Sequence, residues 1–290
     1  MSGSRDTHFL PQFLLRRWGN SKGKVTVYAR QQGRIVTSEL SPRSTAFEPD
    51  LYSYQGVSGE QRHEIETNFM THRIDTPAAL IVQKILDGRF TELTTEEQSD
   101  FTRFVMSLRA RHPDAVALAV NEGKRQLTTA LARDPEEYMA AREPGSPSTL
   151  IEWAEQYTPE LYRNFGVSII PGVITDNKTG ERIFRMPRWV HDIQGASTDL
   201  LISDRPCLLE GNAIEGLCLI ALPLSPSMLF FVCNDPQRTR ALHSMNISDL
   251  VNQMNIASAY YAAERVYGTG QHHLPLVEKL LGFRTTRNIF

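Results

Sequence analysis

The chain has 290 residues, of which 41% are hydrophobic and 22% are charged, and its formal net charge is −2. This composition is typical of a globular protein and excludes a disordered or collagen-like chain. The chain lacks an excess of basic residues. A protein that binds long DNA nonspecifically needs such an excess for its phosphate contacts. No apolar stretch reaches membrane-spanning length and no signal-peptide pattern opens the sequence, so we expect a cytoplasmic protein without a membrane partner.

The first predicted elements are a short helix and a hairpin. Pro11 suits a first helical position, and Gly19 follows the expected helix, so we place this helix at residues 11–18. Two β-type runs, residues 25–28 and 34–37, flank a Gln-Gly segment and predict a β-hairpin. A short extended piece is expected at residues 47–54.

The middle of the chain has helical periodicity. It begins with residues 60–86, which Pro77 must break or kink, and continues with a helix that starts at Thr94. A further helix is expected from Pro113 to about Ala132, and another over residues 150–165. Residues 142–148, REPGSPS, have the composition of a linker.

The last third alternates between short apolar runs and helices. Residues 183–190, 199–203, 217–222 and 228–232 predict an antiparallel meander, and residues 236–243, 248–265 and 274–281 predict helices. Strands at both ends around a helical middle indicate an α+β fold, mainly antiparallel, in which the N-terminal hairpin pairs with the later sheet. We expect a single domain, 1–290, with a helical insert at about 58–165; the alternative is two domains divided near residue 145.

Three cysteines, Cys207, Cys218 and Cys233, lie in or beside apolar runs and form no C-x-x-C pair. An odd count in this setting predicts buried free thiols and a reducing compartment.

The opening segment HFLPQFLLRRW, residues 8–18, resembles the signature of a family of unknown function, DUF4238. Three later features are similar to the same family: Arg111-His112-Pro113 after an apolar helix, the segment LLISDRP at residues 200–206 with LPLSP at 222–226, and an Asn-containing helix that begins near Asn252. The resemblance spans nearly the whole chain, which implies one domain. It implies no activity, because the family has none assigned.

His8, Gln12 and Arg16 recur at intervals of four near the start of the predicted helix. A histidine, an amide and a guanidinium close to free backbone N–H groups can hold a phosphate or a carboxylate. The alternative is that His8 caps the helix while Gln12 and Arg16 anchor it to the sheet.

Ser203-Asp204-Arg205-Pro206 closes an apolar strand. An acid at such a position can act as a general base or a metal ligand, with Ser203 as a contact for substrate. The alternative is an Asp-x-Pro turn in which Asp204 bonds its own backbone. No G-x-S-x-G sequence surrounds Ser203, so a hydrolase nucleophile elbow is not supported.

Scattered polar residues supply further candidates. Glu66 and Asp75 could face inward together if Pro77 bends the chain, and nucleases that use a divalent metal gather carboxylates in this way. Arg111 could hold a phosphate, and Asn255 could contact a ligand from an otherwise apolar helix; exposed helix faces and backbone contacts are the alternatives. His272 and His273 lack a metal-binding spacing, and we interpret their segment as a turn.

Two hypotheses for function follow. The first is a nuclease or phosphodiesterase acting on RNA, a nucleotide or another phosphate substrate, with His8, Asp204 or Glu66 as acid–base groups and with or without a divalent metal. The second is a non-catalytic binding or regulatory module with a protein partner, for example in a bacterial defence or toxin system. The first requires the opening helix and the Ser-Asp-Arg-Pro corner to surround one polar pocket.

Overall fold

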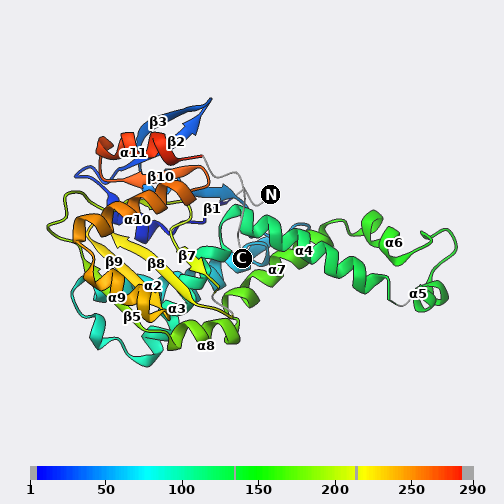
Figure 1. Cartoon of the computed structure of the whole chain (residues 1–290). Helices are drawn as coiled ribbons and strands as arrows, with labels where there is room; N and C mark the ends of the chain where they lie inside the picture. Colours follow the sequence, from blue (N-terminus) through cyan, green and yellow to red (C-terminus); the bar gives the residue numbers. More distant parts are fainter. Residues whose placement is uncertain (1–4, 134, 213–214, 283–290) are drawn as a thin grey trace.

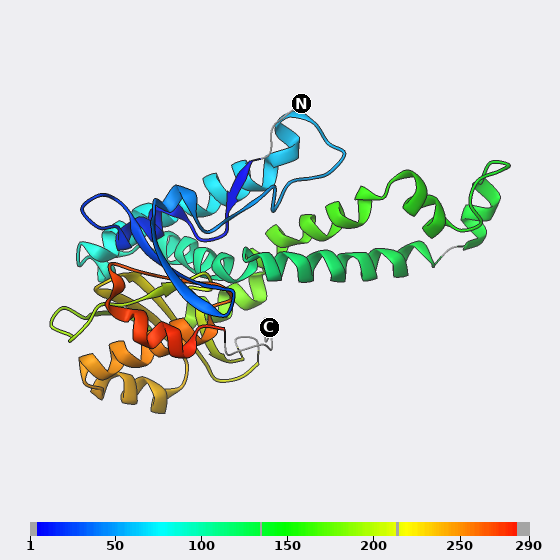
Figure 2. The same cartoon turned by 90° about the horizontal axis from the view of Figure 1, so that it is seen from above.

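The structure, a computed structural model, describes residues 5–133, 135–212 and 215–282. Antiparallel sheets and helices build the α+β fold predicted from the sequence. Most elements form a body, and four consecutive helices, α4 to α7, project from it as an arm (Figure 1). A view from above shows the same division (Figure 2).

The opening segment is anchored on the body by its tryptophan. Strand β1 (Asp6–His8) pairs with β4 (Phe47–Pro49), and the predicted helix forms as α1 (Gln12–Leu15) followed by a 3-10 turn, η1 (Arg16–Trp18). Trp18 is fully buried, and its Nε1–H donates to the carbonyl of Leu200 at 2.6 Å. This bond ties the first helix to a segment 182 residues later in the chain.

The predicted hairpin belongs to a sheet with the order β3-β2-β10-β6. Gln32 and Gly33 take φ values of 48° and 81°, as a two-residue hairpin loop requires. The hairpin does pair with late strands, but two expectations were wrong: residues 202–203 pair with β10 instead of joining the meander, and residue 265 is in a strand, not a helix. The strands are β2 (Val25–Gln31), β3 (Arg34–Leu40), β6 (Ile202–Ser203) and β10 (Arg265–Gly268).

The meander is a second sheet with the order β5-β9-β8-β7. Each residue of its strand β9 is buried, because helices or loops cover both faces. Residues 183–185, expected in the first strand, instead end helix α8. The elements are α8 (Asn177–Arg185), β5 (Arg188–Asp192), β7 (Leu208–Gly211), β8 (Cys218–Ser225) and β9 (Met228–Cys233).

The helices of residues 59–110 pack on this meander. Phe101 of α3 meets Phe230 of β9 edge to face, with ring centroids 4.9 Å apart. Thr94 caps α3 with the reciprocal hydrogen bonds of a capping box, as its sequence predicts. Pro77 marks the point where a π-helix gives way to an α-helix. The elements are η3 (Gly59–His63), the π-helix η4 (Ile65–Asp75), α2 (Thr76–Leu86), η5 (Phe90–Glu92) and α3 (Thr95–Ala110).

The arm consists of α4 (Pro113–Leu131), α5 (Pro135–Ala141), α6 (Leu150–Tyr157) and α7 (Glu160–Ile174). Gly123 of α4 and Gly166 of α7 face each other so closely that a Cβ on Gly123 would lie 2.5 Å from the Cα of Gly166. The linker-like residues 142–148 lie between α5 and α6, where the chain turns back toward the body (Figure 2). Their composition therefore marks the turn of the arm.

The remaining helices are α9 (Pro236–Ser244), α10 (Ile247–Tyr261) and α11 (Leu274–Leu280), and short 3-10 turns occur at η2 (Pro42–Ser44) and η6 (Gln271–His273). Helix α10 lies between the two larger sheets, close to β6 and β7 (Figure 1). Within the described residues, no helix combines the length and the apolar character that crossing a membrane requires.

Candidate functional site

A cavity of about 490 Å³ lies where the arm joins the body. Its walls come from the end of α3, the first turn of α4, the meander, and helices α9 and α10. This volume is within the range of small-molecule sites. The charged and polar lining residues are Arg109, His112, Asp114, Arg205, Glu210, Gln253 and Arg238.

His112 begins the arm and also lines the cavity. It is the N-cap of α4, and its Nδ1 accepts the backbone N–H of Asp114 at 3.2 Å. Because a backbone N–H only donates, Nδ1 is the acceptor, and the proton of the neutral ring belongs on Nε2. Phe9 packs edge-on against this ring, with centroids 5.4 Å apart. The opening motif thus helps to fix the imidazole.

Two ion pairs cross the cavity wall. Arg205 donates to Oδ2 of Asp114, which joins the Ser-Asp-Arg-Pro corner to the start of α4. Arg238 of α9 donates to Glu210 of β7. Among the described residues, the lining therefore carries three arginines against two carboxylates. The N-terminus of α4 adds partial positive charge beside Asp114.

The interior of the cavity is apolar, and it includes a cysteine. Cys207 is buried, and its burial raises the pKa of the thiol to about 11. The thiol is thus protonated at neutral pH and is no nucleophile there. Cys207, Cys218 and Cys233 are free and buried, as predicted from the sequence. The apolar lining includes Leu208, Ala221, Phe231, Leu250 and Met254.

Asp204 points away from this cavity, into the backbone of the chain after α10. Its two carboxylate oxygens accept the N–H groups of Ala263, Glu264 and Arg265 at 2.7 to 2.9 Å. Burial raises the pKa of Asp204, and these three donors partly oppose that rise. Both oxygens are used in backbone contacts, but the partners lie 59 to 61 residues away and are not the local backbone of the turn alternative. We therefore leave Asp204 out of the candidate site.

The predicted trio of the opening segment does form a chain of contacts. Nδ1 of His8 lies 3.3 Å from Nε2 of Gln12, and Arg16 donates to Oε1 of Gln12 at 3.2 Å. The other ring nitrogen of His8 lies 3.2 Å from the carbonyl of Arg43. Burial lowers the pKa of His8. The trio therefore bonds to itself and to neighbouring backbone, and it does not line the cavity. The opening helix and Asp204 thus do not share a pocket, which the hydrolase hypothesis in its first form required.

Glu66 and Arg111 come together in the interior, with Asp75 as the third member. Arg111 is 1% exposed and donates to both oxygens of Asp75, at 3.2 and 2.9 Å. Glu66 is the second residue of the π-helix and Asp75 is its last, and nine residues make about two turns of roughly 4.4 residues each, so both reach the same side. The π-helix, and not a bend at Pro77, brings the two acids to one side.

This interior cluster carries a perturbed acid. Oε2 of Glu66 is shielded from solvent and makes no hydrogen bond within the described residues. Burial raises the pKa of Glu66 to about 7, although the charge of Arg111 opposes the rise. The cluster is closed off from the cavity, because none of its members lines it.

Ser203 and Asn255 have structural contacts. The Ser203 hydroxyl donates to the carbonyl of Arg205 at 3.0 Å and accepts its N–H. The Asn255 amide bridges the carbonyl of Asp199 and the N–H of Leu201 and so ties α10 to the segment before β6. Neither side chain lines the cavity.

None of the eight residues chosen from the sequence lines the cavity, but three of them have a sequence neighbour that does. His112 follows Arg111, Arg205 follows Asp204, and Met254 precedes Asn255. The cavity wall is therefore built from neighbours of these three residues and not from the residues themselves. The signal that could have found His112 is the His-Pro-Asp sequence, which predicts a histidine at a helix N-cap with an acid in the first turn.

A second group of polar side chains lies outside the cavity. Asp199, His272 and His273 form the one cluster among the described residues in which three ligand atoms for a metal lie within 4.8 Å of one another. The sequence spacing of the histidine pair favours a turn and gives no link to Asp199.

Comparison with known proteins identifies the family. The model of the family described as "Protein of unknown function (DUF4238)" matches residues 7–272, and the chain therefore belongs to that family, as its opening motif indicated. No curated protein and no solved structure gives a significant match to the chain.

Proposed function

We propose that this member of the DUF4238 family binds a phosphate ester of nucleotide size in the cavity beside α4 and hydrolyses it, as a nuclease or phosphodiesterase does. The observation that carries the proposal is the ion pair between Arg205 and Asp114. It brings two distant motif segments to one cavity wall, where His112 and Arg109 also lie. Groups from separate parts of the chain that meet in a cavity are typical of a binding site.

The charge of the cavity favours an anionic ligand. Among the described residues that line it, three arginines face two carboxylates, and each carboxylate is paired with an arginine. A guanidinium offers parallel N–H donors that match two phosphate oxygens. The N-terminal end of α4, which carries partial positive charge, lies on the same wall. A phosphate beside Arg109 and Arg205 would therefore lie in a positively charged part of the cavity.

The apolar part of the cavity suits a planar group attached to that phosphate. Phe231, Leu250 and Met254 supply a surface on which a base can be buried. Small-molecule sites commonly combine such an apolar lining with a few polar groups that fix orientation. A nucleotide, free or at the end of an RNA, has both parts. We therefore prefer it to inorganic phosphate as the ligand.

His112 supplies a hydrogen-bond donor to the proposed reaction. Because Nδ1 accepts the N–H of Asp114, Nε2 holds the ring proton and can donate a hydrogen bond to a phosphate oxygen, whose negative charge grows as water attacks phosphorus. The ester P–O bond breaks as the water oxygen bonds to phosphorus, and the proton that the water loses passes to the leaving oxygen. The phosphate stays beside the arginines until it is released.

The test uses the purified full chain with mononucleotides, a short RNA and a generic aryl phosphodiester. His112→Asn should abolish turnover and keep most of the binding, because asparagine retains the N-cap contact but has no imidazole. Arg109→Met should weaken nucleotide binding about tenfold or more, which corresponds to the loss of one charge-assisted contact. Binding is measured by calorimetry and turnover by release of the alcohol product.

A matched control lies on the same helix. Arg103 is an exposed residue of α3 that pairs with Asp100, and Arg103→Met should leave binding and turnover unchanged. Equal loss in both arginine variants would contradict a specific site. Wild-type protein that binds none of the three ligands would overturn the proposal outright.

A non-catalytic regulatory module is the second candidate, and the arm is the observation that favours it. Large apolar side chains are exposed along the arm, at Leu118, Met139, Trp153, Tyr157, Leu161 and Val173. Exposed apolar groups on a projecting element are typical of a surface that meets another protein. Tight nucleotide binding without turnover, in both wild type and His112→Asn, would select this candidate.

A further inference from the structure

Backbone pairing brings the carboxylate of Asp199 next to the loop after β10. Strands β6 and β10 are antiparallel, with Tyr267 opposite Ile202. The residues that follow Tyr267 therefore run alongside those that precede Ile202. This register places Thr269 and the two histidines of η6 beside Asp199, although about 70 residues of sequence separate them. The pairing of β6 with β10 therefore brings the two segments together.

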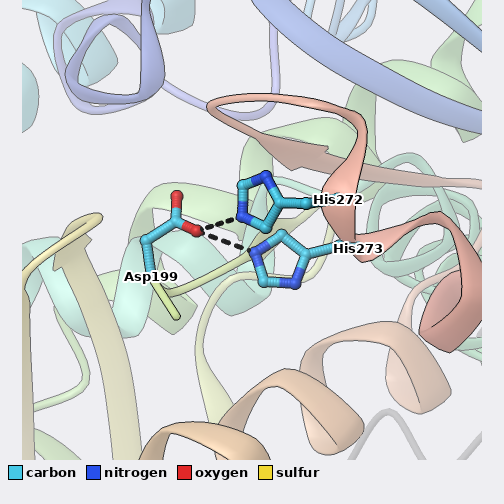
Figure 3. Close-up of side chains that lie close together, drawn as sticks. All are labelled: Asp199, His272 and His273. Carbon is cyan, nitrogen blue, oxygen red and sulfur yellow. Dashed lines mark hydrogen bonds and ion pairs between the residues drawn. The ribbon is translucent and has the colours of Figure 1, made fainter. Parts of the chain in front are cut away.

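The side chains converge on one carboxylate. Nε2 of His272 and Nε2 of His273 lie 2.6 and 2.9 Å from the same oxygen, Oδ1 of Asp199 (Figure 3). Thr269 donates to the other oxygen, Oδ2, at 2.6 Å. The two imidazole rings lie side by side, with centroids 4.1 Å apart. Two ring nitrogens therefore converge on one carboxylate oxygen, and three potential ligand atoms lie within 4.8 Å of one another.

The surroundings fix these groups in place. The Asn255 side chain donates to the carbonyl of Asp199 at 2.8 Å, and the Tyr28 hydroxyl donates to the carbonyl of Gly270. Partners of this kind orient metal ligands in known sites. Both bonds come from regular elements, α10 and β2, so the position of the loop is set by the body of the protein.

Exposure differs between the two rings. The side chain of His273 is 5% exposed and that of Asp199 is 23% exposed, whereas that of His272 is 50% exposed. The cluster therefore has a buried side that holds it and an open side that solvent reaches. An ion could enter past His272 and retain water as a further ligand.

We propose that Asp199, His272 and His273 form a binding site for a divalent transition-metal ion, with Zn²⁺ as the preferred ion. Two imidazole nitrogens with one carboxylate oxygen are a ligand set that Zn²⁺ accepts, with water in the fourth position. Mg²⁺ and Ca²⁺ prefer sites made of oxygen ligands alone. The site lies apart from the cavity, so this inference does not depend on the proposed function.

The test is calorimetric titration of the metal-stripped full chain with Zn²⁺ alone, and with Mg²⁺ alone as the comparison. We expect one equivalent of Zn²⁺ to bind and Mg²⁺ not to compete. Zn²⁺ should also raise the thermal midpoint of unfolding, because an ion that binds the folded chain stabilises it. His272→Gln should lower Zn²⁺ affinity by about tenfold or more. This variant changes a half-exposed side chain and so should fold.

His72→Gln is the matched control, because His72 is exposed on the π-helix and is not part of the cluster. It should bind Zn²⁺ as the wild type does. Three outcomes overturn the proposal. If the wild type does not bind Zn²⁺, the three side chains only join two segments by hydrogen bonds. If His272→Gln binds Zn²⁺ as tightly as the wild type, the ion binds elsewhere, for example at the buried thiols. Equal binding of Mg²⁺ excludes a nitrogen-based site.

Discussion

Two interior carboxylates, Asp204 and Glu66, have opposite environments. Asp204 accepts three backbone N–H groups, and each of its oxygens has a partner. Glu66 is also largely buried, yet one of its oxygens has no hydrogen bond within the described residues. Asp204 closes a corner between a strand and a helix end, whereas Glu66 stands beside the ion pair of Arg111 and Asp75. Both oxygens of Asp204 therefore have hydrogen-bond donors, whereas one oxygen of Glu66 has none among the described residues.

The number of hydrogen-bond donors around a buried carboxylate decides whether it stabilises the fold. A carboxylate that satisfies several backbone donors has a fixed partner set and stabilises the fold through them. A carboxylate buried without enough donors favours its protonated form, and its charge then costs stability. The pKa of Glu66 is raised to about 7 because burial disfavours its charged form. Substitutions of Arg111, Asp204 and Glu66 test this difference.

The largest effect is expected from Arg111→Met. This change removes the cation that pairs with Asp75 and faces Glu66, so two acids remain near each other without compensation. Breaking a buried ion pair in this way costs about 3 to 5 kcal/mol. The free energy of unfolding, measured by denaturant titration, should fall by that amount. Arg103→Met, which removes an exposed pair, should change it by less than about 0.5 kcal/mol.

A triple variant sharpens this result. Adding Asp75→Asn and Glu66→Gln to Arg111→Met removes the uncompensated charges, and should restore part of the lost stability. A loss below about 1 kcal/mol for Arg111→Met alone would show that the cluster is not a stabilising unit.

Asp204→Ala should cost about 3 kcal/mol, because three backbone N–H groups lose their acceptor in a buried corner. Asp204→Asn should lose less, since its amide oxygen still accepts. Thermal or denaturant unfolding measures both. If Asp204→Asn folds normally but loses phosphate-ester turnover, Asp204 acts in catalysis and the structural assignment fails.

Glu66→Gln should have the smallest effect, and one that depends on pH. The folded chain binds a proton at Glu66 up to about pH 7, whereas the unfolded chain releases it near the ordinary pKa of 4.5. Stability of the wild type therefore falls as pH rises between these values and is level above them. A shift of about 2.5 pKa units corresponds to at most about 3 kcal/mol, and solvent contact reduces this to about 2 kcal/mol.

The measurement is the free energy of unfolding at about pH 5 and about pH 8. Glu66→Gln should gain stability relative to wild type at the higher pH. Glu64→Gln, at an exposed neighbouring position, is the control and should follow the wild type at both. Parallel pH profiles for Glu66→Gln and wild type would show that Glu66 titrates normally.

Local signals predicted much of the secondary structure. The capping box at Thr94 and the Gln-Gly turn of the first hairpin act within a few residues, and both elements formed where expected. Arg265 was assigned to a helix and lies in a strand, because its pairing partner Ala29 is more than 200 residues away. The π-helix was also missed, since its register depends on the packing of Ile65 and Phe69 in the core.

The sequence by itself determined the class of fold, the family and the segments that matter. Only the tertiary structure decided which side chain of each segment faces the cavity: Arg205 does and Asp204 does not, and His112 does while Arg111 turns inward. The physical reason is that neighbouring side chains in strands and turns point to different sides. Of two adjacent residues, one can therefore face the interior while the next faces the cavity. The same holds for Asp199 and His272, which meet only through the pairing of β6 with β10.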